Sequence, residues 1–219
     1  MGTDEAGDQD PTEADRLGRA AQGDPAAWSE LLDRYGARLK RMVALRLDVR
    51  LRGRIDPSDV IQEATIQAAR GLPAYLERPD LPFFLWLRWL TGMTLQGIHR
   101  RHLGAQARDA GREVRIADGA MPAASSVALA AQLLGRDTRP LEAAIRAERR
   151  RKVQNALDAR EPAEREVLAL RHFEEFTNVE TARVLNISEA AASKRYLRAL
   201  RKIKSVLVRD PDAIGEPGP

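Results

Sequence analysis

Cysteine is absent from the 219 residues, which excludes disulfide bonds and thiolate metal sites. The three histidines are His99, His102 and His172, and the His99–His102 pair supplies too few ligands for a zinc site. That pair lies in an Arg-rich run, so phosphate contact or simple solvation is the preferred interpretation. A Gly-rich phosphate loop is missing as well. We therefore expect no metal, no cofactor and no enzymatic activity.

Long apolar runs are also missing. The longest stretch, residues 81–95, is interrupted by Arg88 and Gly92 and is too short to cross a bilayer. The first 15 residues are acidic and polar, without the basic and apolar segments of a signal peptide. These features predict a soluble cytoplasmic protein without membrane insertion.

Charge is abundant but nearly balanced. The formal net charge is only +4, although the pI is about 9.7. This balance permits a polyanionic partner without requiring one, so the clustering of the basic residues becomes the deciding feature.

Helical periodicity recurs along the chain, and no convincing strand alternation is found. Asp24-Pro25 and Asp56-Pro57 have the residue types that begin helices. A further helix is expected from about Phe83 to about His102. The predicted fold class is all-α, with two helical domains joined by a flexible linker.

Composition sets the expected boundaries. Residues 1–14 and 210–219 are expected to be disordered tails. Residues 15–110 and 141–209 are expected to form the two domains. The linker is assigned to residues 111–140, which are rich in Ala, Gly, Ser and Pro, with a short helix at residues 127–134.

A helix-turn-helix pattern begins at Thr177, which has the spacing of a capping box with Glu180. Asn186 can close the first helix and Ser188 can cap the second. One side of the second helix is apolar, through Ala192, Tyr196, Leu200, Ile203 and Leu207; the other carries Lys194, Arg195, Arg198, Arg201 and Lys202. The small first turn, Ala190, Ala191 and Ala192, allows close approach to a major groove. DNA binding is favoured over a merely solvated basic face.

The N-terminal half offers two further candidate surfaces. Asp59, Gln62 and Glu63 share one helix face, and such a polar patch suits a positive partner, the alternative being an ordinary solvated face. Trp86 and Trp89 precede a basic run that includes Arg100, Arg101 and Arg108. Aromatic rings beside cations suit single-stranded nucleic acid, although Trp86 is more readily interpreted as a core residue.

These motifs together resemble bacterial sigma factors. The series from Asp59 to Glu63, the pattern from Phe83 to Leu90 and the pair Arg100-Arg101 resemble sigma domain two. Residues 160–204 resemble domain four, and the missing middle domain is similar to the extracytoplasmic-function group. The resemblance covers residues 15–110 and 141–207.

The resemblance implies a factor that directs core RNA polymerase to promoters and assists DNA melting. It places Asp59, Gln62 and Glu63 against the polymerase. The loop of residues 76–82 and the following helix would capture the melted minus-ten strand. Its implied DNA contacts are Trp89, Arg100, Arg101 and Arg108 at the minus-ten element, and Ser188, Ala191, Lys194, Arg195, Arg198 and Lys202 at the minus-thirty-five element. An anti-sigma factor is a further partner that it admits.

An alternative function stays open on the sequence alone. A stand-alone helix-turn-helix regulator, with an N-terminal half that senses a signal or dimerises, needs no polymerase-docking patch. The Asp59–Glu63 face would then have no role in binding.

Overall fold

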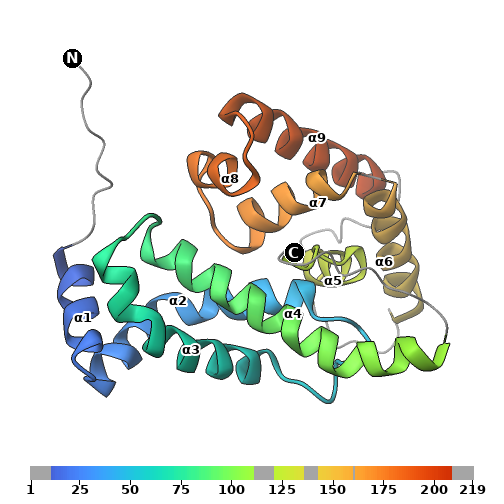
Figure 1. The fold of residues 1–219 in the computed structure, drawn as a ribbon. Coiled ribbons are helices and arrows are strands. Elements are labelled where there is room, and N and C mark those ends of the chain that lie inside the picture. Colours follow the sequence, from blue (N-terminus) through green and yellow to red (C-terminus); the bar gives the residue numbers. More distant parts are fainter. Residues whose placement is uncertain (1–10, 111–120, 136–142, 160, 209–219) are drawn as a thin grey trace, which may run out of the picture. The chain divides into compact units, whose positions relative to one another are not determined.

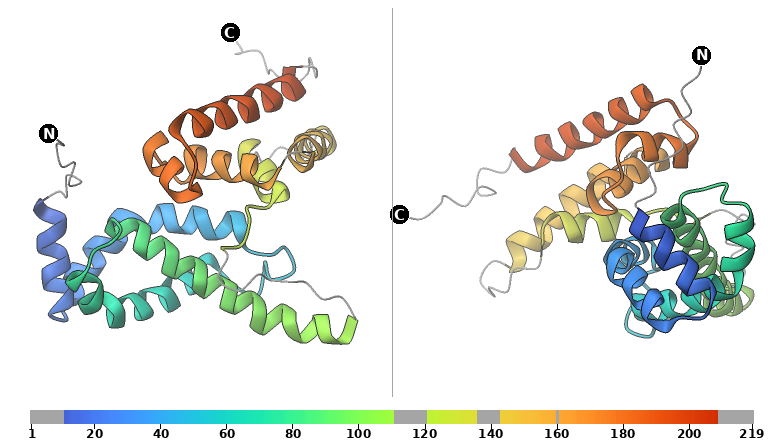
Figure 2. Two further views of the ribbon diagram at one scale, coloured as in Figure 1. Left: turned by 45° about the horizontal axis from the view of Figure 1, so that its top comes forward. Right: turned by 90° about the vertical axis from the view of Figure 1, so that its left-hand side faces the viewer.

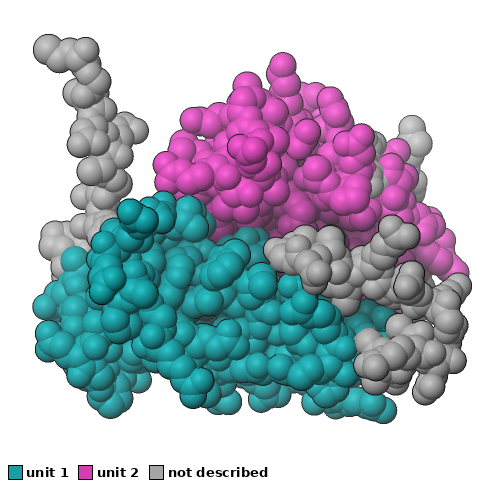
Figure 3. All heavy atoms as spheres, in the orientation of Figure 1, with its two compact units in different colours: residues 1–43, 47–122 teal, residues 44–46, 123–219 magenta. Residues whose placement is uncertain are grey.

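The computed structural model describes residues 11–110, 121–135, 143–159 and 161–208. Within these ranges the regular elements are helices, apart from an isolated bridge between Arg52 and Ile55. The chain divides into two compact units, residues 1–43 with 47–122 and residues 44–46 with 123–219 (Figure 3). The predicted all-α fold class is confirmed for the described part of the chain.

The first unit is built from α1 (Pro11–Ala21), most of α2 (Pro25–Arg46), α3 (Pro57–Glu77) and α4 (Phe83–Ala110) (Figure 1). The predicted N-caps are confirmed, because Asp24 accepts a hydrogen bond from the Ala26 N–H and Asp56 accepts one from the Ser58 N–H. These bonds satisfy donors that the first turn of a helix leaves unpaired. Helix α4 extends beyond the expected end near residue 102.

Packing in the first unit joins α3 to α4, which lie side by side (Figure 2). Val60 of α3 shares one buried cluster with Leu95 and Ile98 of α4 and with Met42 of α2. The apolar positions are three to five residues apart along α4, which turns them toward the same neighbours.

An aromatic cluster anchors the start of α4. The Phe83 ring centroid lies 6.0 Å from the Tyr35 and Tyr75 centroids and 5.8 Å from that of Trp86. Trp86 also stacks on Tyr75, with 4.6 Å between centroids. Trp86 is therefore half-buried and packed, in line with its interpretation as a core residue.

The same cluster fixes the loop between α3 and α4. The Tyr75 hydroxyl donates a hydrogen bond to the Leu81 carbonyl oxygen at 2.7 Å. Burial raises the pKa of Tyr75 to about 12, so its hydroxyl keeps the donated proton at neutral pH. The loop is thereby held against the helix that precedes it.

The second unit contains α5 (Ser126–Leu133), α6 (Ala143–Asp158), α7 (Pro162–Leu168), the π-helical turn η2 (Ala169–Phe173), α8 (Asn178–Leu185) and α9 (Glu189–Val208). Leu129, Val153, Leu168 and Ile203 meet in its core. The short helix expected at residues 127–134 is α5, which supplies Leu129 to this core.

A buried ion cluster lies in the second unit, with which Arg46 is grouped. The Arg46 guanidinium donates to the Glu174 carboxylate at 2.7 Å and to the Glu166 carboxylate at 2.5 Å. The Arg46 and Glu174 side chains are fully buried. Removing one partner would leave a buried charge uncompensated, which is costly.

The two neighbouring histidines of α4 have different surroundings. His99 is buried, and its Nε2 accepts a hydrogen bond from the Asp48 backbone N–H at 3.3 Å, whereas His102 is exposed. The expectation of phosphate contact or solvation is therefore wrong for His99, because the loop after α2 covers this ring.

Lowering the pH should destabilise the first unit through His99. Burial lowers the pKa of His99 below its ordinary value of 6.5, with a further lowering by Arg50 that the Asp48 carboxylate opposes. The unfolded chain then binds a proton at pH values where the folded chain does not, so stability is lost as the pH falls below the ordinary value.

Thermal unfolding measured across about pH 5 to 8 checks this prediction. His99→Gln should flatten the acid side of the stability profile, whereas His102→Gln, its exposed neighbour, should leave the profile as in the wild type. Equal acid slopes in the wild type and His99→Gln would contradict the prediction.

Candidate nucleic-acid interface

Caps define both ends of α8 and the start of α9. The Thr177 hydroxyl accepts from the Glu180 N–H at 3.2 Å, and the Glu180 carboxylate accepts from the Thr177 N–H at 2.7 Å. Asn186 closes α8 with a left-handed backbone, at φ 49°. The Ser188 hydroxyl accepts from the Ala191 N–H at 3.2 Å at the start of α9. The predicted caps and the helix-turn-helix are confirmed.

A polar bridge that the sequence did not indicate fixes α8 against α9. Arg171 donates to the Asn178 side-chain oxygen at 2.8 Å, and the Asn178 amide donates to the Glu189 backbone carbonyl at 3.0 Å. The Arg171 guanidinium also lies 4.8 Å from the centroid of the Tyr196 ring. Together with buried Ala192, these contacts set the direction in which α9 presents its outer face.

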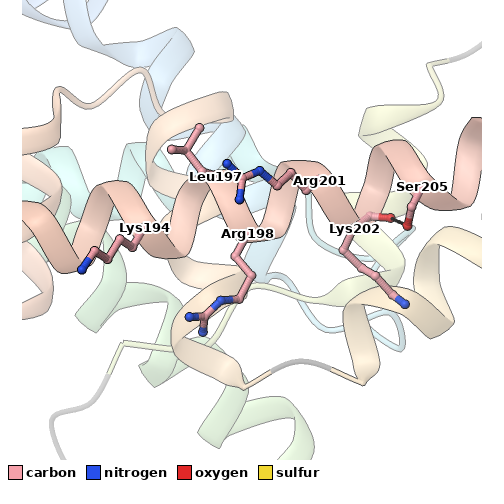
Figure 4. Close-up of a pocket in the computed structure, with 6 residues that line it drawn as sticks. All are labelled: Lys194, Leu197, Arg198, Arg201, Lys202 and Ser205. Atoms are coloured by element: carbon pink, nitrogen blue, oxygen red, sulfur yellow. Dashed lines mark hydrogen bonds between the residues drawn. The ribbon is translucent and has the colours of Figure 1, made fainter.

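The outer face of α9 carries a shallow cationic groove of about 490 Å³. The groove is lined by Lys194, Leu197, Arg198, Arg201, Lys202 and Ser205 (Figure 4). In Figure 4 Leu197 projects from the opposite edge of the helix to Arg198 and Lys202. Such a surface can bind the phosphates of a polyanion, because each cation that neutralises a phosphate releases condensed counterions.

Arg198 differs from the other cations of the groove. Its guanidinium donates to the Glu164 carboxylate at 3.1 Å, and the Glu164 side chain is only 7% exposed. The pair joins α9 to α7. The structure therefore gives Arg198 a role in positioning the helix that its place on a basic face did not indicate.

The remaining minus-thirty-five candidates cluster at the start of α9. Ser188 is exposed at the N-cap, and Ala191 and Arg195 are half-buried in the first two turns. Leu197 was not among the predicted site residues, yet it is 46% exposed and lines the groove. The sequence could have indicated Leu197, because it is an apolar residue on a helix face that otherwise carries cations.

The predicted patch on α3 is more constrained than its sequence indicated. The Asp59 carboxylate accepts from the Asp56 N–H at 3.0 Å and completes a capping box. The Glu63 carboxylate pairs with Arg101 at 3.0 Å. Asp59 and Glu63 are therefore tied to neighbours within the first unit, whereas Gln62 is exposed.

A second cavity, of about 480 Å³, lies at the junction of α3, the following loop and α4. It is lined by Gly71, Ala74, Tyr75, Arg78, Asp80, Leu81, Trp86, Trp89 and Leu90. Trp89 is 51% exposed, so its ring is accessible for stacking. Apolar walls with charged groups at the loop suit an unpaired base.

The three predicted arginines of this region are not equivalent. Arg100 is exposed, while Arg101 is engaged by Glu63. The Arg108 side chain lies outside the described residues. The structure thus brings Trp89, but not this basic run, to the cavity.

The ranges that the structure describes contain no group of three or more His, Asp or Glu side chains placed to hold a metal ion. None of their helices is sufficiently long and apolar to cross a membrane.

Residues 156–205, which include α7, α8 and most of α9, match the family model described as sigma-70, region 4. Among solved structures, CnrH in complex with the cytosolic domain of CnrY is similar in fold, with a TM-score of 0.52 and 20% identity over 91% of this chain and 99% of that chain. The sigma factor RpoE in complex with the anti-sigma factor NepR from Bartonella quintana aligns with a TM-score of 0.44 and 19% identity over 83% and 96% of the two chains. No curated protein sequence matches the chain significantly.

The Arg198–Glu164 pair should stabilise the second unit. Arg198→Ala should lower the free energy of unfolding by about 1 kcal/mol, because nearly buried Glu164 loses a charged partner. Lys194→Ala, on the same groove, should change stability by less than about 0.5 kcal/mol.

Urea unfolding of the full chain, followed by circular dichroism, measures both effects. A double-mutant cycle with Glu164→Gln isolates the pair, since Arg198→Ala should cost less in that background. Equal stabilities of Arg198→Ala and Lys194→Ala would show that the ion pair has no structural role.

Proposed function

We propose that this chain, whose residues 156–205 match the sigma-70 region 4 model, is a sigma factor of the extracytoplasmic-function type. It directs core RNA polymerase to specific promoters and assists DNA melting at initiation. The observation that carries the proposal is the capped helix-turn-helix of α8 and α9, whose outer groove is cationic and lies within the matched region.

In this proposal each helical domain has its own partner surface. Residues 15–110 act as sigma domain two and residues 141–209 as domain four, with residues 111–140 between them, of which α5 packs in the core of the second unit. Ser188, Ala191, Lys194, Arg195 and Lys202 contact the minus-thirty-five duplex from α9. Arg198 acts chiefly on the position of α9 through Glu164.

Polymerase docking is assigned to the exposed face of α3. Gln62 is the strongest candidate for direct contact, because Asp59 also caps the helix and Glu63 also pairs with Arg101. Charge reversal at Asp59 would therefore remove the helix cap as well as a docking contact, and the two effects could not be separated. A polar patch of this kind suits a positive partner surface.

Melted minus-ten DNA is assigned to the cavity beside Trp89. Extruding a base costs a few kcal/mol, which stacking and pocket contacts can offset. Trp89 supplies the exposed ring, and Arg100 and Arg101 supply positive charge farther along α4. Arg108 remains a proposed contact.

We place the protein in the cytoplasm, where its polymerase and promoter partners are found. An anti-sigma factor is a further proposed partner, since CnrH, which is similar in fold, is seen in complex with the cytosolic domain of CnrY. The proposed activity is binding and strand separation, with no catalytic step.

Gln62→Arg should weaken binding to core polymerase by at least about tenfold. A new positive charge on the exposed face of α3 would oppose a positive partner surface, and like-charge contact costs several kcal/mol. Co-purification and a binding titration with core polymerase measure the effect.

Glu77→Arg is the matched control, because Glu77 is exposed at the other end of the same helix. It should bind like the wild type. If Gln62→Arg retains full affinity, this face does not contact the polymerase. If the wild-type chain itself fails to bind core polymerase, the alternative of a stand-alone regulator is favoured.

Trp89→Ala should impair opening of duplex promoters by the polymerase complex. Base–aromatic stacking is worth about 1–3 kcal/mol per base, and α4 would lose its exposed ring. Permanganate reactivity of thymines near the start site reports opening, and a pre-melted bubble should restore transcription because unpairing is already complete.

Val49→Ala, which also removes an exposed apolar side chain of the first unit, should open promoters normally. Normal opening by Trp89→Ala would show that this ring takes no part in strand separation. Absence of melted thymines with the wild-type chain on every host promoter would overturn the sigma-factor proposal itself.

A further inference from the structure

The connection between α2 and α3 is rich in arginine. Residues 47–56 have the sequence LDVRLRGRID, with an arginine at every second position from Arg50 to Arg54. Arg50, Arg52 and Arg54 are all exposed, whereas Leu51 between them is buried. The first unit therefore carries a short cationic segment outside its helices, and we call residues 50–54 the arginine turn.

The arginine turn is held by its own backbone and by buried neighbours. The N–H groups of Arg54 and Ile55 both donate to the Leu51 carbonyl oxygen, at 3.0 and 3.1 Å. Gly53 has a φ of 96°, a left-handed conformation that glycine adopts without steric cost. Leu47 and Leu51 are buried on either side of the exposed positions. The turn thus presents its guanidinium groups from a fixed backbone.

The charges of this segment are engaged to different degrees. The Arg50 guanidinium donates two hydrogen bonds to the Asp48 carboxylate, at 3.0 and 2.9 Å, so this pair adds little net charge. The Asp56 carboxylate accepts the Ser58 N–H as the cap of α3. Within the described residues no hydrogen bond or ion pair engages the Arg54 guanidinium. The turn therefore has a net positive charge, and Arg54 is available to an external anion.

The arginine turn lies beside the basic second half of α4 (Figure 1). The Asp48 backbone N–H donates to the His99 Nε2 at 3.3 Å, and Leu51 shares a buried cluster with residues 98 and 103 of α4. Arg100, which follows His99, is exposed. Cations from two separate segments of the chain are therefore found at the same end of the first unit.

We propose that the arginine turn binds the sugar–phosphate backbone of duplex DNA next to the melted region. The inference rests on the proposed function, because it extends DNA contact from the unpaired strand at Trp89 to the duplex beside it. Guanidinium groups match the geometry of phosphate oxygens and can bind them with two parallel hydrogen bonds. Such contacts position the DNA without reading its sequence.

The length of α4 predicts which phosphates are contacted. From Trp89 to Arg100 the helix rises about 16 Å, at about 1.5 Å per residue. Base pairs of a duplex are about 3.4 Å apart, so a strand that follows α4 from Trp89 reaches the arginine turn about five base pairs into the duplex.

The first test uses the full chain with core polymerase and a promoter that contains a pre-melted bubble, titrated at several salt concentrations. Arg54→Ala should reduce the dependence of log K on log salt by about one unit, because one phosphate contact is lost. It should also weaken binding to different promoter sequences alike. Arg54→Lys keeps the charge and should retain the salt dependence.

Arg70→Ala is the matched control, because it removes another exposed arginine of the first unit, from the middle of α3. With the chain fully bound to core polymerase, it should show the salt dependence of the wild type. Equal reductions in Arg70→Ala and Arg54→Ala would overturn the assignment of a contact to the turn.

Methylphosphonate linkages locate the contact on the DNA. Each linkage replaces one charged phosphate by a neutral group, and the linkages are placed singly in the duplex on both sides of the bubble. Wild-type binding should be weakened by linkages about five base pairs from the bubble. The same linkages should have little effect in Arg54→Ala, because the partner of that phosphate is already absent.

The remaining outcomes separate the inference from the proposed function. Linkages that weaken the wild type and Arg54→Ala equally at every position would overturn the phosphate contact. Weaker binding of Arg54→Ala to core polymerase without DNA would overturn it as well, since the turn then contacts an acidic protein surface. If the wild-type chain does not raise the affinity of the polymerase for any promoter, the proposed function fails instead.

Discussion

The first turn of each helix leaves backbone N–H groups without partners, and in this protein short polar side chains satisfy them where the candidate surfaces begin. Asp56 and Asp59 fix the start of α3, from which the proposed docking face projects. Thr177 and Ser188 fix α8 and α9 in the same way. Each surface therefore depends on a cap that sets where its helix starts and which residues turn outward.

A second constraint is the pairing of charges within each unit. Glu63 engages Arg101, and Glu164 engages Arg198, so two arginines with the sequence signature of DNA contacts also hold helices together. Lys194, Arg201 and Lys202 remain on the outer groove of α9. The basic character of this groove thus exceeds what a net charge of +4 suggests.

In the first unit, the aromatic cluster around Phe83 holds the start of α4 and the loop before it in place. It packs Trp86 and Tyr75 against each other, and Tyr75 in turn holds the loop that carries Asp80. Trp89, three residues farther along α4, is left exposed at the same cavity. Trp86 forms part of the packed wall of the cavity, whereas Trp89 exposes its ring there. The same stretch of α4 therefore contributes both to the core and to an open site.

The sequence by itself determined the local features. The helical class, the caps at Asp24, Asp56 and Thr177, and the turn closed by Asn186 follow from contacts between residues two to five positions apart. The spacing of residue types along the sequence indicates such contacts, because the helix repeat brings those positions together independently of the rest of the chain.

Only the tertiary structure decided how the surface charges and rings are used. Arg198 and Glu164 are 34 residues apart, and Arg101 and Glu63 are 38 apart, so no periodicity connects them. The burial of His99 by the loop at Asp48 and the cavity that unites Trp89 with Asp80 have the same origin. These features arise where separate helices and loops pack, and packing depends on the fold of the whole unit rather than on the spacing within one helix.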